Sequence, residues 1–206
     1  MKIQGTPNEI IEALTDDYPE IPGVLAYVRK RVARIKREVD EFQAAALYVL
    51  AKQYDRPSAK FLEIGTAWGY SAAVQASAAP QADIATINPR SDENESAWKH
   101  LRDFNNVRIL ETRSWDYLAE YSGRDIDFMF VDGDHKRLRL DLPWWGHIAP
   151  GGTMLFHDYS PETSRRPCPV VFEILNEWRD TLGRDFDVSI IDDSGVGIVG
   201  YVQTSE

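Results

Sequence analysis

The chain has 206 residues, of which 43% are hydrophobic and 27% are charged, and its formal net charge is −10. This length and composition are ordinary for one globular domain, and the acidic surplus argues against a nucleic-acid or anionic-membrane surface. The single cysteine, Cys168, excludes an intramolecular disulfide and a cysteine-rich metal site. The first residues, MKIQGTPNEI, lack the apolar core of a signal peptide, and no apolar run approaches the ~20 residues that span a bilayer. We therefore expect a cytoplasmic enzyme or binding protein.

The N-terminal part of the chain is predicted to be helical. Thr6-Pro7-Asn8-Glu9 has the hydroxyl cap, first-turn proline and following glutamate that begin many helices. Apolar residues spaced by three and four over 24–53 predict one or two amphipathic helices. Six basic residues fall mostly on the solvent face or, alternatively, mark an anionic partner: Arg29, Lys30, Arg31, Arg34, Lys36 and Arg37. We expect residues 1–55 to form a helical appendage to an α/β domain of residues 56–206, the two making one structural unit.

From Lys60 onward, short apolar runs alternate with amphipathic stretches at 92–104, 113–121 and 136–147. This alternation predicts a mostly parallel sheet with helices on both faces. Near the end, FDVSII and GVGIVGYVQ are separated by a short polar segment, which predicts an antiparallel hairpin. We expect a Rossmann-like α/β fold with a seven-stranded sheet whose last strand is antiparallel.

Two glycines mark the end of the first strand in KFLEIGTAWGYSAAVQASA. Glu63 lies within the strand, and Gly65 and Gly69 bracket the turn into a helix of small residues. The spacing differs from the dinucleotide fingerprint and from a P-loop, so on its own it indicates a tight turn only. In open parallel sheets, however, ligands bind beyond the carboxyl ends of the strands. The turn is therefore a candidate ligand site.

The sequence E-x-G-x-x-x-G after this strand resembles the cofactor loop of class I S-adenosylmethionine-dependent methyltransferases. LPWWGHIAPGGTMLFHDY is similar to the segment that passes through Pro-Gly-Gly into the fifth strand of that superfamily. FVDGDH together with FHDY resembles more closely the subgroup of macrolide-sugar O-methyltransferases and cephalosporin-hydroxylase-like proteins. The resemblance covers residues 42–203. It implies S-adenosylmethionine as the cofactor and a hydroxyl of a small molecule, such as a sugar or phenol, as the acceptor.

The resemblance places six residues around the cofactor: Glu63, Gly65, Gly69, Asn88, Ser114 and Trp115. The first three would frame the methionine part, and the last two would lie against the adenine. Asn88 takes the place of an acidic residue that holds the ribose hydroxyls, and Arg113 stands where aspartate is common. Since asparagine can both accept and donate hydrogen bonds, these departures weaken the expected binding without excluding it.

Two carboxylates are predicted to meet at one edge of the sheet. Asp132 and Asp158 end the fourth and fifth strands, which are neighbours ~4.8 Å apart in this fold. Their oxygens suit Mg²⁺ or another divalent cation, with Asp134 as a third ligand. His135 would be the general base of the reaction. In the alternative interpretation, this run is only a turn in which Asp134 caps the next helix.

Two residues near this edge are given no chemical role. His157 is interpreted as a satisfied, partly buried histidine. Cys168 lies in the proline-rich segment 160–170, which is either a flap beside the acceptor or an ordinary connection. No base is expected near this cysteine to activate it.

Methyl transfer to a small-molecule hydroxyl is the leading hypothesis, without nucleic-acid or membrane partners and compatible with a homo-oligomer. The alternative is a non-catalytic or decayed methyltransferase scaffold that binds a nucleoside-like ligand, which Asn88 and Arg113 favour. Metal-dependent hydroxylation ranks last, because the matched positions contain no evident set of two histidines and one carboxylate.

Overall fold

The computed structural model describes residues 1–31 and 39–204, so the predicted surface residues Arg34, Lys36 and Arg37 lie outside the described residues. The first part of the chain contains β1 (Lys2–Gly5), α1 (Pro7–Asp17), α2 (Ile21–Arg31), α3 (Glu41–Lys52), β2 (Lys60–Ile64) and α4 (Tyr70–Ala78). Next come β3 (Asp83–Ile87), α5 (Ser91–Leu101), β4 (Val107–Leu110), α6 (Ser114–Glu120) and β5 (Ile126–Val131). The 3₁₀ helices η1 (His135–Leu140) and η2 (Leu142–His147) lead to β6 (Ile148–Tyr159), α7 (Pro169–Leu182), β7 (Val188–Asp192) and β8 (Gly197–Val202).

The strands of the described residues form one eight-stranded sheet in the order β1-β7-β8-β6-β5-β2-β3-β4. β8 runs antiparallel to both β6 and β7, and the other neighbours are parallel. The predicted mostly parallel α/β sheet with an antiparallel last strand is confirmed. The eighth strand, β1, was not predicted, and it pairs with β7 at the edge of the sheet.

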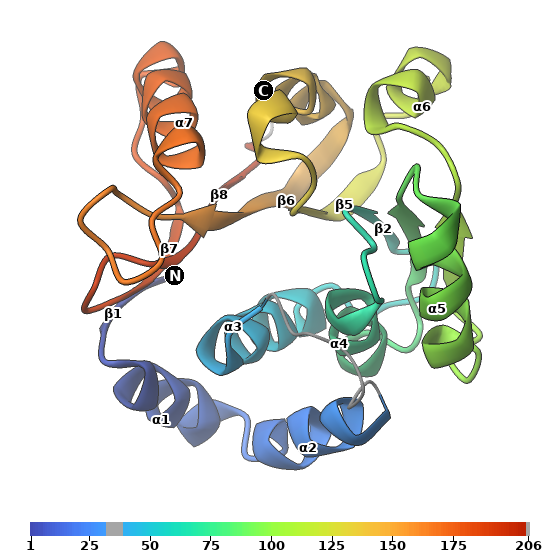
Figure 1. The fold of residues 1–206 in the computed structure, drawn as a ribbon, viewed down its shortest axis with the longest axis horizontal. Helices are drawn as coiled ribbons and strands as arrows, with labels where there is room; N and C mark the ends of the chain where they lie inside the picture. Colours follow the sequence, from blue (N-terminus) through green and yellow to red (C-terminus); the bar gives the residue numbers. More distant parts are fainter. Residues whose placement is uncertain (32–38, 205–206) are drawn as a thin grey trace.

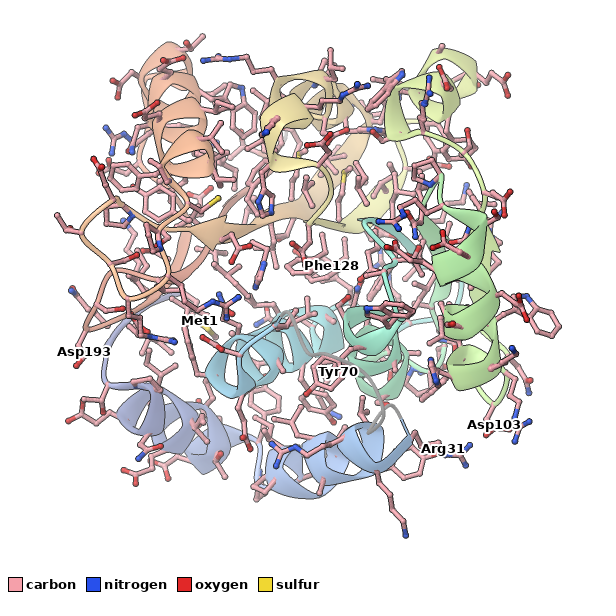
Figure 2. All side chains as sticks on the ribbon, viewed as in Figure 1. Met1, Arg31, Tyr70, Asp103, Phe128 and Asp193 are labelled. Carbon is pink, nitrogen blue, oxygen red and sulfur yellow. The ribbon has the colours of Figure 1, made fainter. Side chains whose placement is uncertain are left out.

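Helices cover both faces of the sheet. In Figure 1, α3 and α4 lie against one face with α1 and α2 outside them, whereas α6, η1, η2 and α7 lie on the other side. Successive residues of a strand serve opposite faces, so Phe128 belongs to the core shared with α3 and α4, and Met129 to the core shared with α7. Figure 2 shows the Phe128 side chain between the sheet and these two helices.

The N-terminal residues contribute directly to this core. Thr6 and Glu9 form the predicted capping box at the start of α1. Ten consecutive residues of α3, from Phe42 to Ala51, are buried, because the helix is enclosed by the sheet and by neighbouring helices. Farther out, Arg31 at the end of α2 forms an ion pair with Asp103, and the two are labelled close together in Figure 2.

Residues 136–147, predicted as one amphipathic stretch, form two 3₁₀ helices instead. Pro143, at the start of η2, has no N–H to continue the hydrogen bonding of η1. The short helices carry the chain from the end of β5 back to β6. None of the helices in the described part of the chain is long and apolar enough to cross a membrane.

Candidate active site

The turn after β2 depends on left-handed backbone conformations. The φ angles of Gly65, Ala67 and Gly69 are +102°, +40° and +85°. A Cβ atom on Gly65 would lie 2.0 Å from the carbonyl oxygen of Asp132, so the ends of β2 and β5 can meet only because residue 65 is glycine. Gly65, Ala67 and Asp132 line a narrow cleft, but Gly69 does not; the other lining residues are Val39, Thr66, Trp68, Tyr70 and Ser71.

Glu63 supports this turn from beneath and does not itself line the cleft. Its side chain is fully buried and accepts hydrogen bonds from Gln75 of α4 (2.8 Å) and from the hydroxyl of Thr86 in β3. Burial raises the pKa of Glu63 to about 7. The carboxyl group therefore connects β2, β3 and α4.

Asn88 lies at the end of β3, where its amide is already engaged. Its Nδ2 donates to a carboxylate oxygen of Glu93 at 3.0 Å, and Glu93 also pairs with Arg90 at 2.8 Å. The carboxylate of Glu93 thus lies beside Asn88, the position at which an acidic residue was expected to hold the ribose.

Ser114 and Trp115 begin α6. The buried Ser114 hydroxyl donates to Asp141, and burial raises the pKa of Asp141 to about 6. The guanidinium carbons of Arg113 and Arg137 lie 5.8 Å and 5.1 Å from the centre of the Trp115 ring. Among the described residues, neither member of this pair nor Asn88 lines the cleft at the glycine turn.

The two predicted carboxylates do converge. Asp132 follows β5 directly, and Asp158 lies in β6 with a left-handed φ of +52°. At the same place the pairing between β6 and β8 shifts register between Phe156 and Tyr159. Irregularities of this kind redirect a side chain, and aspartate tolerates the left-handed conformation better than most residues. One ligand atom each from Asp132, Asp158 and His135 consequently lie within 4.8 Å of one another.

His135 is the third member of this cluster. Its Nε2 lies 3.4 Å from Asp158 and 3.8 Å from Asp132, and its side chain is 35% exposed. The interaction with Asp132 raises the pKa of the imidazole. Its other nitrogen, Nδ1, lies 3.5 Å from the sulfur of Cys168. The expectation that no base lies near Cys168 is therefore wrong, although burial raises the pKa of the thiol and keeps it protonated.

His157 lies against the same two carboxylates, although its side chain is completely buried. Its Nδ1 is 3.0 Å from Asp132 and 3.3 Å from Asp158, and its Nε2 is 3.0 Å from Oε1 of Gln43. Burial alone would lower the pKa of His157, but Asp132 and Asp158 together raise it to about 10. The ring is therefore positively charged at neutral pH.

Asp134 does not join the cluster. Its carboxylate accepts from the backbone N–H of Lys136 at 3.1 Å and lies 3.5 Å from Arg137, with 57% of its side chain exposed. It caps η1, as the alternative interpretation of this run predicts. Residues 132–135 thus combine both predicted arrangements. Asp134 caps a helix, and Asp132 and His135 converge with Asp158.

A search of curated proteins finds no match, but a family model described as a methyltransferase domain matches residues 62–159. These residues run from β2 to the end of β6 and include the glycine turn and both converging carboxylates. This segment of the chain therefore has the sequence pattern of a methyltransferase domain.

Solved structures share the fold of this chain at low sequence identity. An O-methyltransferase from Bacillus cereus in complex with S-adenosylhomocysteine has a TM-score of 0.68 and 18% identity, over 95% of this chain and 97% of that one. The O-methyltransferase TomG from Streptomyces achromogenes, in complex with S-adenosylmethionine, has a TM-score of 0.64 and 21% identity, over 87% and 89%. A Podospora anserina methyltransferase with bound S-adenosylhomocysteine has a TM-score of 0.65 and 16% identity, over 90% and 88%.

Two residues of the candidate site were not predicted from the sequence. His157 was given no role, and Gln43 belongs to α3, outside the matched residues. The only available signal was the position of His157 next to Asp158. His135 and His157 both lie beside the carboxylates of Asp132 and Asp158. The sequence alone did not indicate that two histidines would meet the two carboxylates.

Proposed function

We propose that this protein transfers the methyl group of S-adenosylmethionine to a hydroxyl oxygen of a small molecule, assisted by a divalent cation at Asp132 and Asp158. The observation that carries the proposal is the contact between two sites. Asp132 lines the cleft of the glycine turn, and its carboxylate belongs to the cluster with Asp158 and His135. A cofactor held at the turn would therefore lie next to groups able to bind and deprotonate an acceptor.

The cofactor assignment is supported by the family match and by the cofactors bound in the similar structures. We assign Gly65 and Gly69 to its methionine part, with Glu63 holding the turn from beneath. Asn88, Ser114 and Trp115 remain the proposed contacts of the ribose and adenine. The Glu93 carboxylate, hydrogen-bonded to Asn88, offsets the missing acidic residue at the end of β3.

The donor set fits a divalent cation. One oxygen each of Asp132 and Asp158 lie within 4.8 Å of each other, and ligands bound at ~2.1 Å from one ion are separated by about 3–4 Å. When bound, the ion supplies Lewis-acid chemistry that lowers the pKa of an acceptor hydroxyl. Asp132 and Asp158 are the proposed ligands. Asp134 is a less suitable ligand, because its carboxylate already accepts from the N–H of Lys136 and lies beside Arg137.

His135 is the proposed general base. The acceptor oxygen attacks the methyl carbon, the bond from carbon to sulfur breaks, S-adenosylhomocysteine leaves, and the hydroxyl proton moves to Nε2 of His135 in its deprotonated form. Because the interaction with Asp132 raises the pKa of this imidazole, the deprotonated form gains population as the pH rises. The partial exposure of the side chain gives an acceptor access to it. The adjacent Asp132 and Asp158 then stabilise the imidazolium that forms.

Calorimetric titration with S-adenosylhomocysteine, followed by methyl-transfer assays on a panel of phenols and sugars, tests the proposal. We expect binding of S-adenosylhomocysteine and activity that a chelator removes. His135→Ala should reduce turnover about 10²–10⁴-fold with unchanged affinity for S-adenosylhomocysteine, and Asp132→Asn and Asp158→Asn should each raise the required metal concentration. Activity that persists in the presence of the chelator would contradict the role of the divalent cation. Binding without transfer to any acceptor would favour the non-catalytic nucleoside-binding alternative.

A further inference from the structure

We propose that Gln43 of α3 is a positioning residue for the reactive centre, because it sets the orientation of the His157 ring and thereby holds Asp132 and Asp158. The inference rests on the proposed function in one respect, which is that these carboxylates bind a cation. It assigns a role to a helix outside the residues that match the methyltransferase domain.

Hydrogen-bond chemistry determines which way each group points. Oε1 of Gln43 lies 3.0 Å from the backbone nitrogen of Asp40, which can only donate, so this end of the amide must be the oxygen. The same oxygen lies 3.0 Å from Nε2 of His157, which must therefore carry a hydrogen. With Nε2 committed to Gln43, Nδ1 is the nitrogen that faces Asp132 and Asp158.

The acceptor in Gln43 is held rigidly. The side chain is fully buried at the third position of α3, and its bond to the Asp40 backbone closes the first turn of that helix. The carboxylate of Asp40 in turn accepts from Arg165 at 2.5 Å and from Arg166 at 2.9 Å, both in the segment that follows β6. The start of α3 is thus fixed from two sides.

The imidazole of His157 has little freedom around this contact. Its side chain has no exposed surface, and the Phe130 ring packs edge-on to it with the ring centres 5.9 Å apart. If Gln43 offered no acceptor, the buried Nε2–H would be unsatisfied, which favours a rotated ring. Nδ1–H would then no longer hold the two carboxylates at a fixed separation.

Three variants test this role without a known acceptor molecule. Gln43→Met keeps the size of the side chain and removes the acceptor, whereas Gln43→Glu keeps an acceptor oxygen. Val49→Ala, buried in the same helix, is the matched control for a loss of packing alone. The readouts are the ¹⁵N and ¹H signals of the His157 ring, Mn²⁺ affinity and S-adenosylhomocysteine affinity, all by NMR and calorimetry on the full chain.

We expect Gln43→Met to shift the His157 ring signals and to weaken Mn²⁺ binding about 10–100-fold, the usual cost of losing a partner behind a ligand. S-adenosylhomocysteine affinity should not change. Gln43→Glu should restore the Mn²⁺ affinity, and Val49→Ala should leave the ring signals as in the wild type. If Gln43→Met does not fold, Gln43→Asn, which is too short to reach His157, takes its place.

Unchanged His157 signals in Gln43→Met, or a Gln43→Glu variant as impaired as Gln43→Met, would overturn the positioning role. Failure of the proposed function gives a different result. A wild-type protein that binds neither Mn²⁺ nor S-adenosylhomocysteine would contradict methyl transfer, while the ring signals would still decide whether Gln43 orients His157.

Discussion

The turn after β2 and the cluster at the ends of β5 and β6 lie side by side, but they are built differently. The turn comes from contiguous residues, and its shape follows from glycines at left-handed positions. The cluster is assembled from separate elements, and its order depends on polar contacts between residues as distant as Gln43 and His157. A local backbone requirement is visible in a sequence, whereas a buried network between distant residues is not.

The largest effect should come from Gly65, which packs against the backbone of Asp132 where the two regions meet. Gly65→Val places a branched side chain against the backbone of Asp132 at a left-handed φ, so we expect a loss of more than about 4 kcal/mol in the free energy of unfolding. Gly69→Ala is the milder comparison, since its Cβ would meet only the end of the Leu101 side chain, at 2.9 Å, and should cost about 1–2 kcal/mol. Urea denaturation measures both. Equal midpoints for Gly65→Val and the wild type would contradict the proposed junction.

Glu63 should make the stability of the turn depend on pH. Burial raises its pKa from 4.5 to about 7, so between these values the folded state holds the proton and the unfolded state does not. Stability should therefore fall as pH rises from about 4.5 to 7, by on the order of 3 kcal/mol. Glu63→Gln can keep both hydrogen bonds, because the Thr86 hydroxyl can also accept, and it should remove this contribution. Denaturation curves from pH 5 to 8 test the sign, and identical slopes for both proteins would refute it.

The smallest effect is expected at Asp134. Asp134→Ala removes the cap of η1, which should cost about 1 kcal/mol of stability, and it should leave Mn²⁺ affinity unchanged. Asp132→Asn, two residues away, serves as the contrasting variant, with clearly weaker Mn²⁺ binding. A tenfold loss of Mn²⁺ affinity in Asp134→Ala would return this residue to the set of ligands.

Prediction from sequence succeeded where the signal was local. The alternation of strands and helices gave the sheet, and the glycine spacing gave the turn. It failed at β1, because four residues contain too little pattern to predict a strand that pairs with residues 189–192. At the site, the positions of Asp132 and Asp158 followed from neighbouring strands, but the left-handed conformation of Asp158 and the partners of His157 depend on tertiary contacts. At Asp134 the sequence left a cap and a ligand open, because both use the same residue type, and the structure places the side chain at the cap of η1.

The pairing of β1 with β7 also affects how the protein is made. On the ribosome β1 emerges before the central strands β2 to β6, yet its hydrogen-bonding partner β7 is synthesised after all of them. Until then its backbone groups have only water to bind, while the central strands can already pair with one another. Closing this edge of the sheet requires residues 2–5 to meet residues 189–192, and this large separation in sequence makes it a slow, late step of assembly.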